Sequence, residues 1–528
     1  MIMIDVLKAK KAGIRTEEYI LAVDMGTTAF KAAVFDYDGK ELGCATREYS
    51  IIAPHPGWAE VEVSTYVEAF NYVINKAIEN VAERQPDNEE PITLADILTV
   101  GFSCQCETSV FLDKDGKPLR NAIVWLDTRA SKQAEDIVDT FGSRTVQKNT
   151  GQVGADAIWP GAKLLWLKEN EPEVFGGIDK VLQLNSYMAY LLTGRFVSED
   201  SMLGSSIYFN VNTRKYWAEM LDYIGITENQ LPDIRRPGDY VGNVSVDAAS
   251  EFGFSTYTAV SIGGTDLACA AIGSGNIKPG DFSDSTGSSI CTMTLVDHLV
   301  IDPDKHMPCY CSALPGMFMV HSYGNGGMFM KWFRDILCDK EMEIEAGGGK
   351  NAYDQLDILA AQAPAGCGGL IALPHLQGSG PPWVNPNAKA VFYGMTLAHT
   401  KAHFVRAIME SVTMVLSCII DATERLDIKV DKIVTTGGGA LSPIWCQIKA
   451  DVTGRPVITT VNNESSGCLG AAILAGLSSG AWPDLETACE ATIRQDIVYK
   501  PNPENREVYD KTLADFKQLM GCLEPMFK

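Results

Sequence analysis

The chain has 528 residues, of which 46% are hydrophobic and 21% charged, so it is long enough to bury a large core without disulfides or a structural metal. Its 44 Lys and Arg against 67 Asp and Glu give a net charge of −23, which argues against nucleic acid or an anionic membrane surface as a partner. The 14 cysteines lie mostly in apolar contexts and are interpreted as free thiols of a reducing compartment.

Residues 1–18 form a polar, basic lead-in that lacks the apolar stretch and cleavage site of a signal peptide. No apolar run approaches the length that a membrane span needs, so we expect no membrane-spanning segment. These features together predict a cytoplasmic protein.

The first clear element is a β-hairpin, with strands expected over 19–23 and 31–36. Its turn is Asp24-Met25-Gly26-Thr27-Thr28. A turn that contains Gly can bring backbone N–H groups close to an anion, and the Thr hydroxyls add donors. The carboxylate at its start could hold Mg²⁺. An ordinary hairpin turn is the alternative, and the motif alone does not decide between them.

Strands and helices then alternate, as in an α/β domain. Apolar spacing predicts a helix over 63–81 with Ser64 as its N-cap, and buried strands over 97–103 and 121–126. Further helices are expected over 130–140, 162–169 and 185–192.

A carboxylate follows two glycines at the end of the apolar segment 258–262, in Gly263-Gly264-Thr265-Asp266. In phosphoryl transfer, a positioned Asp accepts the proton of the attacking hydroxyl. The alternative is that Asp266 caps the following helix.

A second unit begins near residue 279. Segment 282–295 is again a strand, a small-residue turn and a strand, and it loosely repeats the first hairpin. A triple glycine follows the strand expected over 432–436, and helices are expected over 403–426, 443–453 and 467–480. Segments 347–350 and 363–369 are expected to be loops. No P-loop, HExxH or GxSxG string occurs in the sequence.

These turns, in this order, resemble the FGGY family of carbohydrate kinases. The similarity extends from about residue 19 to about residue 480, and its more specific segments are 116–130, 163–167, 378–395, 403–411, 437–457 and 464–476. The resemblance implies an α/β fold of two actin-like (ribonuclease H-like) domains with an interdomain cleft. The N-terminal extension would be 1–18, the carbohydrate-binding domain 19–278 and the ATP-binding domain 279–528.

The resemblance also implies a role for each matching residue. Asp24 would hold Mg²⁺, and Asp266 would be the catalytic base and contact the substrate. ATP would be bound by Gly26, Thr27, Thr28, Gly287, Ser288, Gly438, Gly439 and Ala440. The carbohydrate would be bound by Gln105, Glu107, Asp127 and Trp159, although Trp159 could instead be a core aromatic residue and Glu107 a structural carboxylate.

The segment 103–108 departs from the family pattern. The Arg of glycerol kinases is replaced by Cys106, which argues against glycerol, and the His of xylulokinases is absent, which argues against xylulose itself. We expect ATP-dependent phosphorylation of a hydroxyl of a ketose, a polyol or a related small carbohydrate. The alternatives are a kinase of a linear signalling hydroxyketone such as autoinducer-2, and an actin-like ATPase without a sugar pocket. A homodimer is left open.

Overall fold

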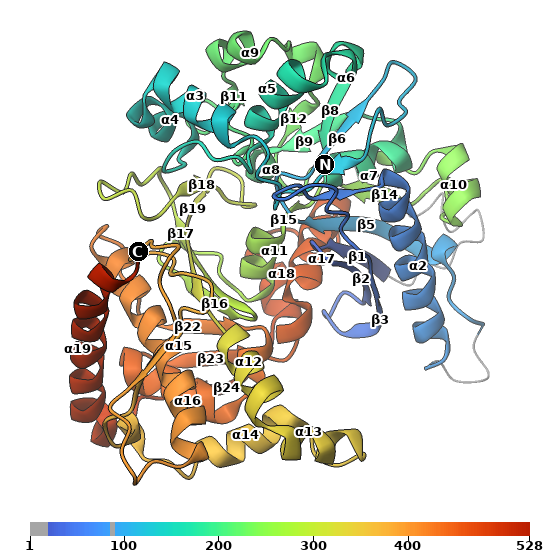
Figure 1. The fold of residues 1–528 in the computed structure, drawn as a ribbon. Coiled ribbons are helices and arrows are strands. Elements are labelled where there is room, and N and C mark those ends of the chain that lie inside the picture. Colours follow the sequence, from blue (N-terminus) through green and yellow to red (C-terminus); the bar gives the residue numbers. More distant parts are fainter. Residues whose placement is uncertain (1–18, 85–89) are drawn as a thin grey trace.

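The computed structural model describes residues 19–84 and 90–528, so the predicted extension 1–18 lies outside the described residues. Two seven-stranded sheets organise the chain (Figure 1). The first has the order β13 (Tyr240–Asn243), β14 (Ala259–Ser261), β5 (Ile97–Cys104), β1 (Tyr19–Met25), β2 (Ala29–Phe35) and β3 (Glu41–Glu48), and β15 (Gly264–Thr265) also pairs with β5.

The second sheet repeats the central arrangement of the first. Its order is β18 (Cys309–Cys311), β19 (Phe318–Asn325), β17 (Ser289–Val296), β16 (Phe282–Thr286), β22 (Ile433–Thr436), β23 (Val457–Thr460) and β24 (Gln495–Tyr499). In both sheets the first strand of a hairpin pairs antiparallel with the second and parallel with a later strand: β1 with β2 and β5, and β16 with β17 and β22. The predicted relation between the two hairpins therefore extends to the sheets around them.

Helices cover the outer faces of both sheets. On the first they include α2 (Val63–Ala82), α7 (Leu184–Thr193) and α10 (Val246–Phe252), and on the second α15 (Lys401–Glu424), α16 (Pro443–Thr453) and α19 (Arg506–Leu523). Within the described residues, α15 alone is long and apolar enough to cross a membrane, with a mean hydropathy of 1.5 over its most apolar window. Because 89% of that window is buried, α15 packs as a core helix of the second half.

Two helices lie between the sheets, α11 (Asp266–Gly273) and α17 (Ser466–Ser479). Their backbones touch at glycines: a Cβ on Gly470 would lie 1.9 Å from the carbonyl oxygen of Cys269, and one on Gly273 would lie 2.0 Å from that of Ser466. α17 also packs against β1 and β5. A helix from the last part of the chain therefore covers the inner face of the first sheet.

A smaller layer sits above the first sheet in Figure 1. It contains the four-stranded sheet β4 (Glu60–Val61), β7 (Ala122–Ile123), β6 (Ser109–Leu112) and β8 (Lys180–Gln183), with α3 (Ser131–Phe141) and α5 (Pro160–Asn170). One face of this small sheet belongs to the core of the main sheet, and its other face packs in a second apolar core with α3 and α5. The remaining longer elements are α4 (Ser143–Thr150), α6 (Pro172–Gly177), α8 (Asp200–Leu203), α9 (Ala218–Ile224), α12 (Met328–Leu337), α13 (Asp339–Ala346), α14 (Ala352–Ala360) and α18 (Leu485–Thr492).

Most predicted elements are confirmed, with three corrections. The loop predicted over 363–369 contains a short 3-10 helix, η3 (Ala365–Gly369). The N-cap of α2 is Glu62, not Ser64, because the helix already begins at Val63. The strand predicted over 121–126 is reduced to Ala122–Ile123, because the chain turns directly after it. The domain boundary near residue 279 stays a prediction.

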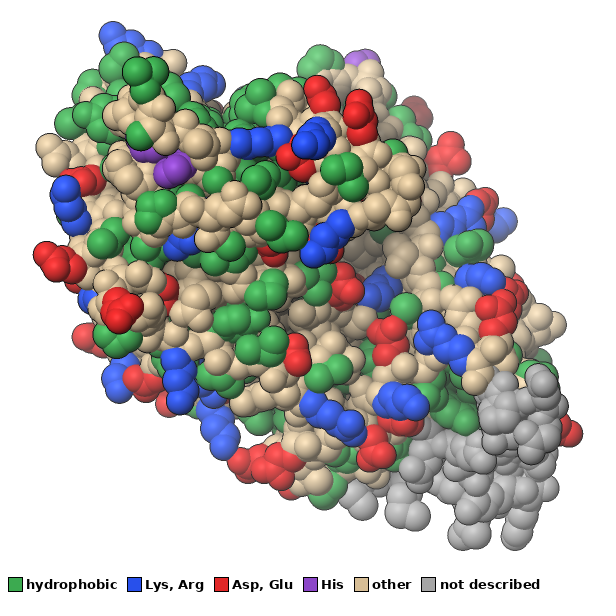
Figure 2. All heavy atoms as spheres, turned by 90° about the horizontal axis from the view of Figure 1, so that it is seen from below, with side chains coloured by type: hydrophobic (Ala, Val, Ile, Leu, Met, Phe, Trp, Pro, Cys, Tyr) green, Lys and Arg blue, Asp and Glu red, His purple; other side chains and the backbone are tan. Residues whose placement is uncertain are grey.

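Figure 2 views the molecule from the side of α13 and α14. Acidic, basic and hydrophobic side chains are interspersed over this face. The net negative charge of the chain is therefore not gathered into one acidic patch here.

Candidate active site

The predicted catalytic carboxylates meet at one edge of the first sheet. The pairing of β1 with β5 places Asp24 beside Ser103, and that of β15 with β5 places Thr265 beside Cys104. Asp266 follows immediately as the first residue of α11. The carboxyl ends of neighbouring parallel strands are where ligands bind in open α/β sheets.

Asp266 does not cap α11. The N-cap is Thr265, whose hydroxyl accepts from the N–H of Ala268 at 3.3 Å, so the capping alternative is wrong. The Asp266 carboxylate accepts from the N–H of Leu267 at 2.7 Å. Burial, with the nearby charge of Asp24, raises the pKa of Asp266 to about 7. A carboxylate with such a pKa is suited to accept a proton near neutral pH.

Asp24 is half-buried and held from one side. Its Oδ1 accepts from the hydroxyl of Ser103 at 2.6 Å, while a Cβ on Gly467 would lie 3.2 Å from Oδ2. Burial raises the pKa of Asp24, against the lowering effects of Ser103 and Lys31. Mg²⁺ prefers carboxylate oxygens, and two neighbouring half-buried acids gain from a cation that offsets their repulsion. Asp24, with Asp266 beside it, therefore fits the predicted metal.

The turn of the first hairpin, residues 24–28, is predicted to bind phosphate and is here called the first phosphate turn. Hydrogen bonds connect it to the residues around it. Gly26 donates its N–H to the carbonyl of Ala29 at 3.0 Å, which closes the hairpin. The indole Nε1–H of Trp125 donates to the hydroxyl oxygen of Thr27 at 2.8 Å, and Thr28 is exposed. The hydroxyl groups of Thr27 and Thr28 remain as possible donors to phosphate. The sequence does not identify Trp125 as a site residue, although it lies in segment 116–130, which carries part of the family resemblance.

Glu107 lies in the loop between β5 and β6. It is a half-buried residue with a φ of 60°, an unusual conformation for a non-glycine residue that is often found at functional sites. Burial raises its pKa, Ser205 and Lys163 lower it, and Asp266 raises it further. Lys163 is fully buried and donates to the carbonyl of Val124 at 2.8 Å. Glu107, which is predicted to bind the substrate, and Asp266, the predicted base, are therefore close enough for their charges to interact.

Two other predicted substrate residues are placed differently. The Gln105 amide donates to the carbonyl of Gly26 at 3.3 Å, and its Oε1 is buried with no protein partner among the described residues. Trp159 is the N-cap of α5 and packs on the core of the smaller layer, and its buried indole N–H has no partner in the described part of the chain. Gln105 thus supports the first phosphate turn, and Trp159 combines core packing with a free donor.

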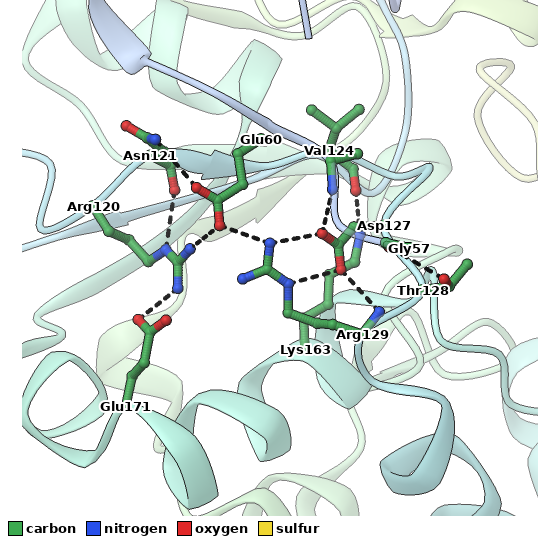
Figure 3. A network of polar contacts seen from close by, with 11 residues as sticks. Gly57, Glu60, Arg120, Asn121, Val124, Asp127, Thr128, Arg129, Lys163 and Glu171 are labelled. Carbon is green, nitrogen blue, oxygen red and sulfur yellow. Dashed lines mark hydrogen bonds and ion pairs between the residues drawn. The ribbon is translucent and has the colours of Figure 1, made fainter. Parts of the chain in front are cut away.

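Asp127 belongs to a buried ionic network (Figure 3). Its Oδ2 accepts from the N–H of Ala59 at 2.6 Å, and Arg129 donates to both of its oxygens. Arg129 also donates to Glu60 at 2.7 Å, and Glu60 pairs with Arg120. With both oxygens engaged, Asp127 is placed to anchor the segment that carries Trp125 and to influence the charge of Lys163.

Most of the residues predicted to bind nucleotide in the second half line a cavity of about 530 Å³. Gly287, Ser288, Gly438 and Gly439 lie on its wall, whereas the neighbouring Ala440 is buried and does not. Polar and aromatic residues that the sequence analysis did not identify complete the wall, among them Lys331, Asn351, Tyr353, Asp354, Asp357, Ser442 and Trp445. No signal in the local sequence connects α12 and α14 to this cavity.

Comparisons with known proteins agree with this arrangement. The N-terminal domain of the FGGY family of carbohydrate kinases matches residues 19–273, and the C-terminal domain of that family matches residues 284–479. A xylulose kinase of Staphylococcus epidermidis is 29% identical over 508 residues, covering 95% of this chain and 96% of that protein. An autoinducer-2 kinase of Salmonella typhimurium is 27% identical over 503 residues, covering 93% and 92%.

Solved structures give the same result for the fold. The structure of a ligand-bound xylulose kinase from Lactobacillus acidophilus matches with a TM-score of 0.84 and 27% identity, over 97% of this chain and 99% of that one. That of a gluconate kinase from the same species matches with a TM-score of 0.83 and 27% identity, over the same shares of both chains. The predicted two-domain actin-like fold is therefore confirmed. From its two matching domains, which cover most of its length, this chain belongs to the FGGY family of carbohydrate kinases.

Proposed function

We propose that this kinase transfers the γ-phosphoryl group of ATP to a hydroxyl of a neutral small carbohydrate, either a ketose or a polyol. The observation that carries the proposal is Asp266, a half-buried carboxylate with a pKa raised to about 7 at the strand edge where Asp24 and Glu107 also lie. Family membership favours this reading over an actin-like ATPase without a sugar pocket.

In the proposed mechanism Asp266 is the general base. It accepts the proton of the substrate hydroxyl as that oxygen forms a bond to the γ-phosphorus and the bond to ADP breaks. Glu107 accepts hydrogen bonds from other substrate hydroxyls and fixes which one faces Asp266. Thr27, Thr28 and the turn at Gly287 donate to phosphate oxygens. A Mg²⁺ ion held by Asp24 would supply positive charge to the phosphates.

The charges around Asp266 favour a neutral substrate. Asp24 and Glu107 are acidic, and Lys163 is the basic group that acts on Glu107. An aldonate would add a further negative charge to this low-dielectric region, where like charges repel most strongly. Gluconate is therefore a poorer candidate than a ketose or polyol. The similarity to the autoinducer-2 kinase keeps a linear hydroxyketone as the second candidate.

A screen of purified protein tests the proposal. ADP release is measured with Mg²⁺ and ATP in the presence of D-xylulose, D-ribulose, xylitol, glycerol, gluconate or linear autoinducer-2. We expect a neutral polyhydroxy compound to give the highest kcat/KM. Highest activity with gluconate, or ADP release that no compound stimulates, would contradict it. The homodimer, the cytoplasmic location and the absence of nucleic-acid and membrane partners stay predictions.

A further inference from the structure

A buried ion pair lies beneath the nucleotide cavity. The Nζ of Lys449, on α16, is 2.6 Å from Oδ2 of Asp284, on β16, and neither side chain is exposed to solvent. The same ammonium group donates to the hydroxyl oxygens of Thr286 at 2.8 Å and Thr435 at 2.7 Å. All three of its partners therefore come from the ends of the two neighbouring strands β16 and β22.

These strand ends lead directly into the two turns predicted to bind ATP, which we call the phosphate turn (residues 287–288) and the adenosine turn (residues 437–440). Thr286 precedes Gly287, and Thr435 lies two residues before Gly437. The register of β16 with β22 sets Asp284 beside Thr435, and α16 begins just after the second turn (Figure 1). Lys449 thus connects the phosphate turn, the adenosine turn and the helix that follows it.

The two turns approach each other closely. A Cβ on Gly439 would lie 2.8 Å from the Cβ of Thr286, and one on Gly437 would lie 3.0 Å from the carbonyl oxygen of Thr286. A small shift of β16 against β22 would therefore move the Gly287 side of the cavity against the Gly438 side.

Asp284 and Lys449 do not line the cavity, so they do not touch the nucleotide directly. Removing two charges from water is costly, and a well-packed apolar pair often gives equal or greater stability. Oδ1 of Asp284 moreover has no partner among the described residues. Stability alone therefore explains this pair poorly, and a role in fixing geometry explains it better.

We infer that Asp284 and Lys449 are positioning residues for ATP. They hold the phosphate turn and the adenosine turn at the separation that a bound nucleotide needs. This inference rests on the nucleotide site in the proposed function, and it goes beyond it by making nucleotide affinity depend on a pair of residues outside the cavity.

The test is calorimetric binding of Mg·ADP, which requires no sugar and no turnover. The variants are Lys449→Met and the apolar double variant Asp284→Leu/Lys449→Met, each checked by its melting temperature. We expect the dissociation constant for ADP to rise at least about tenfold in both. The double variant should melt above Lys449→Met, because it does not leave Asp284 buried without a partner.

The matched control is a buried ion pair of the same half, Arg406 with Glu410, at 2.8 Å on α15. The double variant Arg406→Met/Glu410→Leu should bind ADP within about threefold of the wild type. Near-wild-type affinity in the Asp284/Lys449 double variant, or an equal loss in the control, would overturn the inference. If Lys449→Met does not fold, the double variant still decides. Wild-type protein that does not bind ADP would instead refute the nucleotide site itself.

Discussion

The carboxylate of Asp266 is replaced most conservatively by an amide. Asp266→Asn keeps the hydrogen bond from the Leu267 N–H but cannot accept a proton from the substrate. We expect kcat to fall by about 10²–10⁴, as is typical when a general base is lost. Binding of Mg·ADP, measured by calorimetry, should persist. A near-wild-type kcat in the purified variant would remove Asp266 from its proposed role.

Glu107 is held in a left-handed turn beside Lys163, an arrangement suited to a side chain that must face a ligand. Glu107→Gln keeps the shape but exchanges an acceptor for a donor. We expect kcat/KM for the carbohydrate to fall at least about tenfold, or about 1.4 kcal/mol of transition-state binding. The KM for ATP should barely change. Equal losses for both substrates, together with a lower melting temperature, would identify a structural residue.

Asp24 is expected to act through the metal. Asp24→Ala removes a carboxylate whose other contact is the hydroxyl of Ser103. We expect steady-state titrations to show a raised Mg²⁺ requirement and little change in the KM for the carbohydrate. Asp38→Ala, in an exposed turn after β2, is the control and should leave the Mg²⁺ dependence unaltered. An unchanged Mg²⁺ requirement in Asp24→Ala would count against a metal role.

At the scale of helices and strands, the N-cap residue of α8, Glu199, makes the stability of the protein depend on pH. Glu199 is its N-cap and accepts from the N–H groups of Ser201 and Met202, and the Ser201 hydroxyl in turn accepts from the N–H of Thr265. Burial raises the pKa of Glu199 to about 8 despite these donors. The other ionisable groups near it are Asp200, Cys269 and Cys311.

Because the folded pKa exceeds the unfolded value of 4.5, the native state binds more protons than the unfolded state between these values. The contribution of Glu199 to the free energy of unfolding is therefore fully present below pH 4.5 and is lost as the pH rises towards 8. Glu199→Gln should therefore gain stability relative to the wild type over this range, by at most about 1.4 kcal/mol per pH unit. Denaturant unfolding at several pH values measures it, and the exposed Glu68→Gln is the control. A pH-independent difference would contradict the raised pKa.

Helices and strands were predicted well where the local sequence pattern determines them, and poorly where tertiary structure does. The sequence pattern located α16 at 443–453 and placed α15 within two residues, because both are largely apolar and are buried over most of their length. The same reasoning overextended the strand at 121–126, since a run of apolar residues does not show where the chain turns. The turn motifs predicted the glycines that line the nucleotide cavity, but no motif indicated Trp125 or Asn351. Those residues reach the site from distant elements, and only tertiary packing reveals this.

At the scale of the whole molecule, the close contact between α11 and α17 connects the two sheets. Gly470→Ala would place its new methyl group 1.9 Å from the Cys269 carbonyl oxygen, so the two helices would have to separate. We expect a loss of stability of about 1–3 kcal/mol and a lower kcat, since Asp266 begins one of the helices. Gly521→Ala is the control: Gly521 lies on α19 with no atom close to its added Cβ, and this substitution should stabilise by about 0.5–1 kcal/mol. Equal effects of the two changes would contradict the packing argument.

The placement of α17 also has a consequence for synthesis. Ile20, Ala22, Ala33 and Phe35 of the first sheet share their core with α11 and α17. A ribosome makes the strands of that sheet long before it makes Leu469, which lies far along the chain. Domains usually fold as they emerge. We therefore expect the first half to emerge with an apolar face that stays uncovered by α17, and to complete its folding only after α17 has been made.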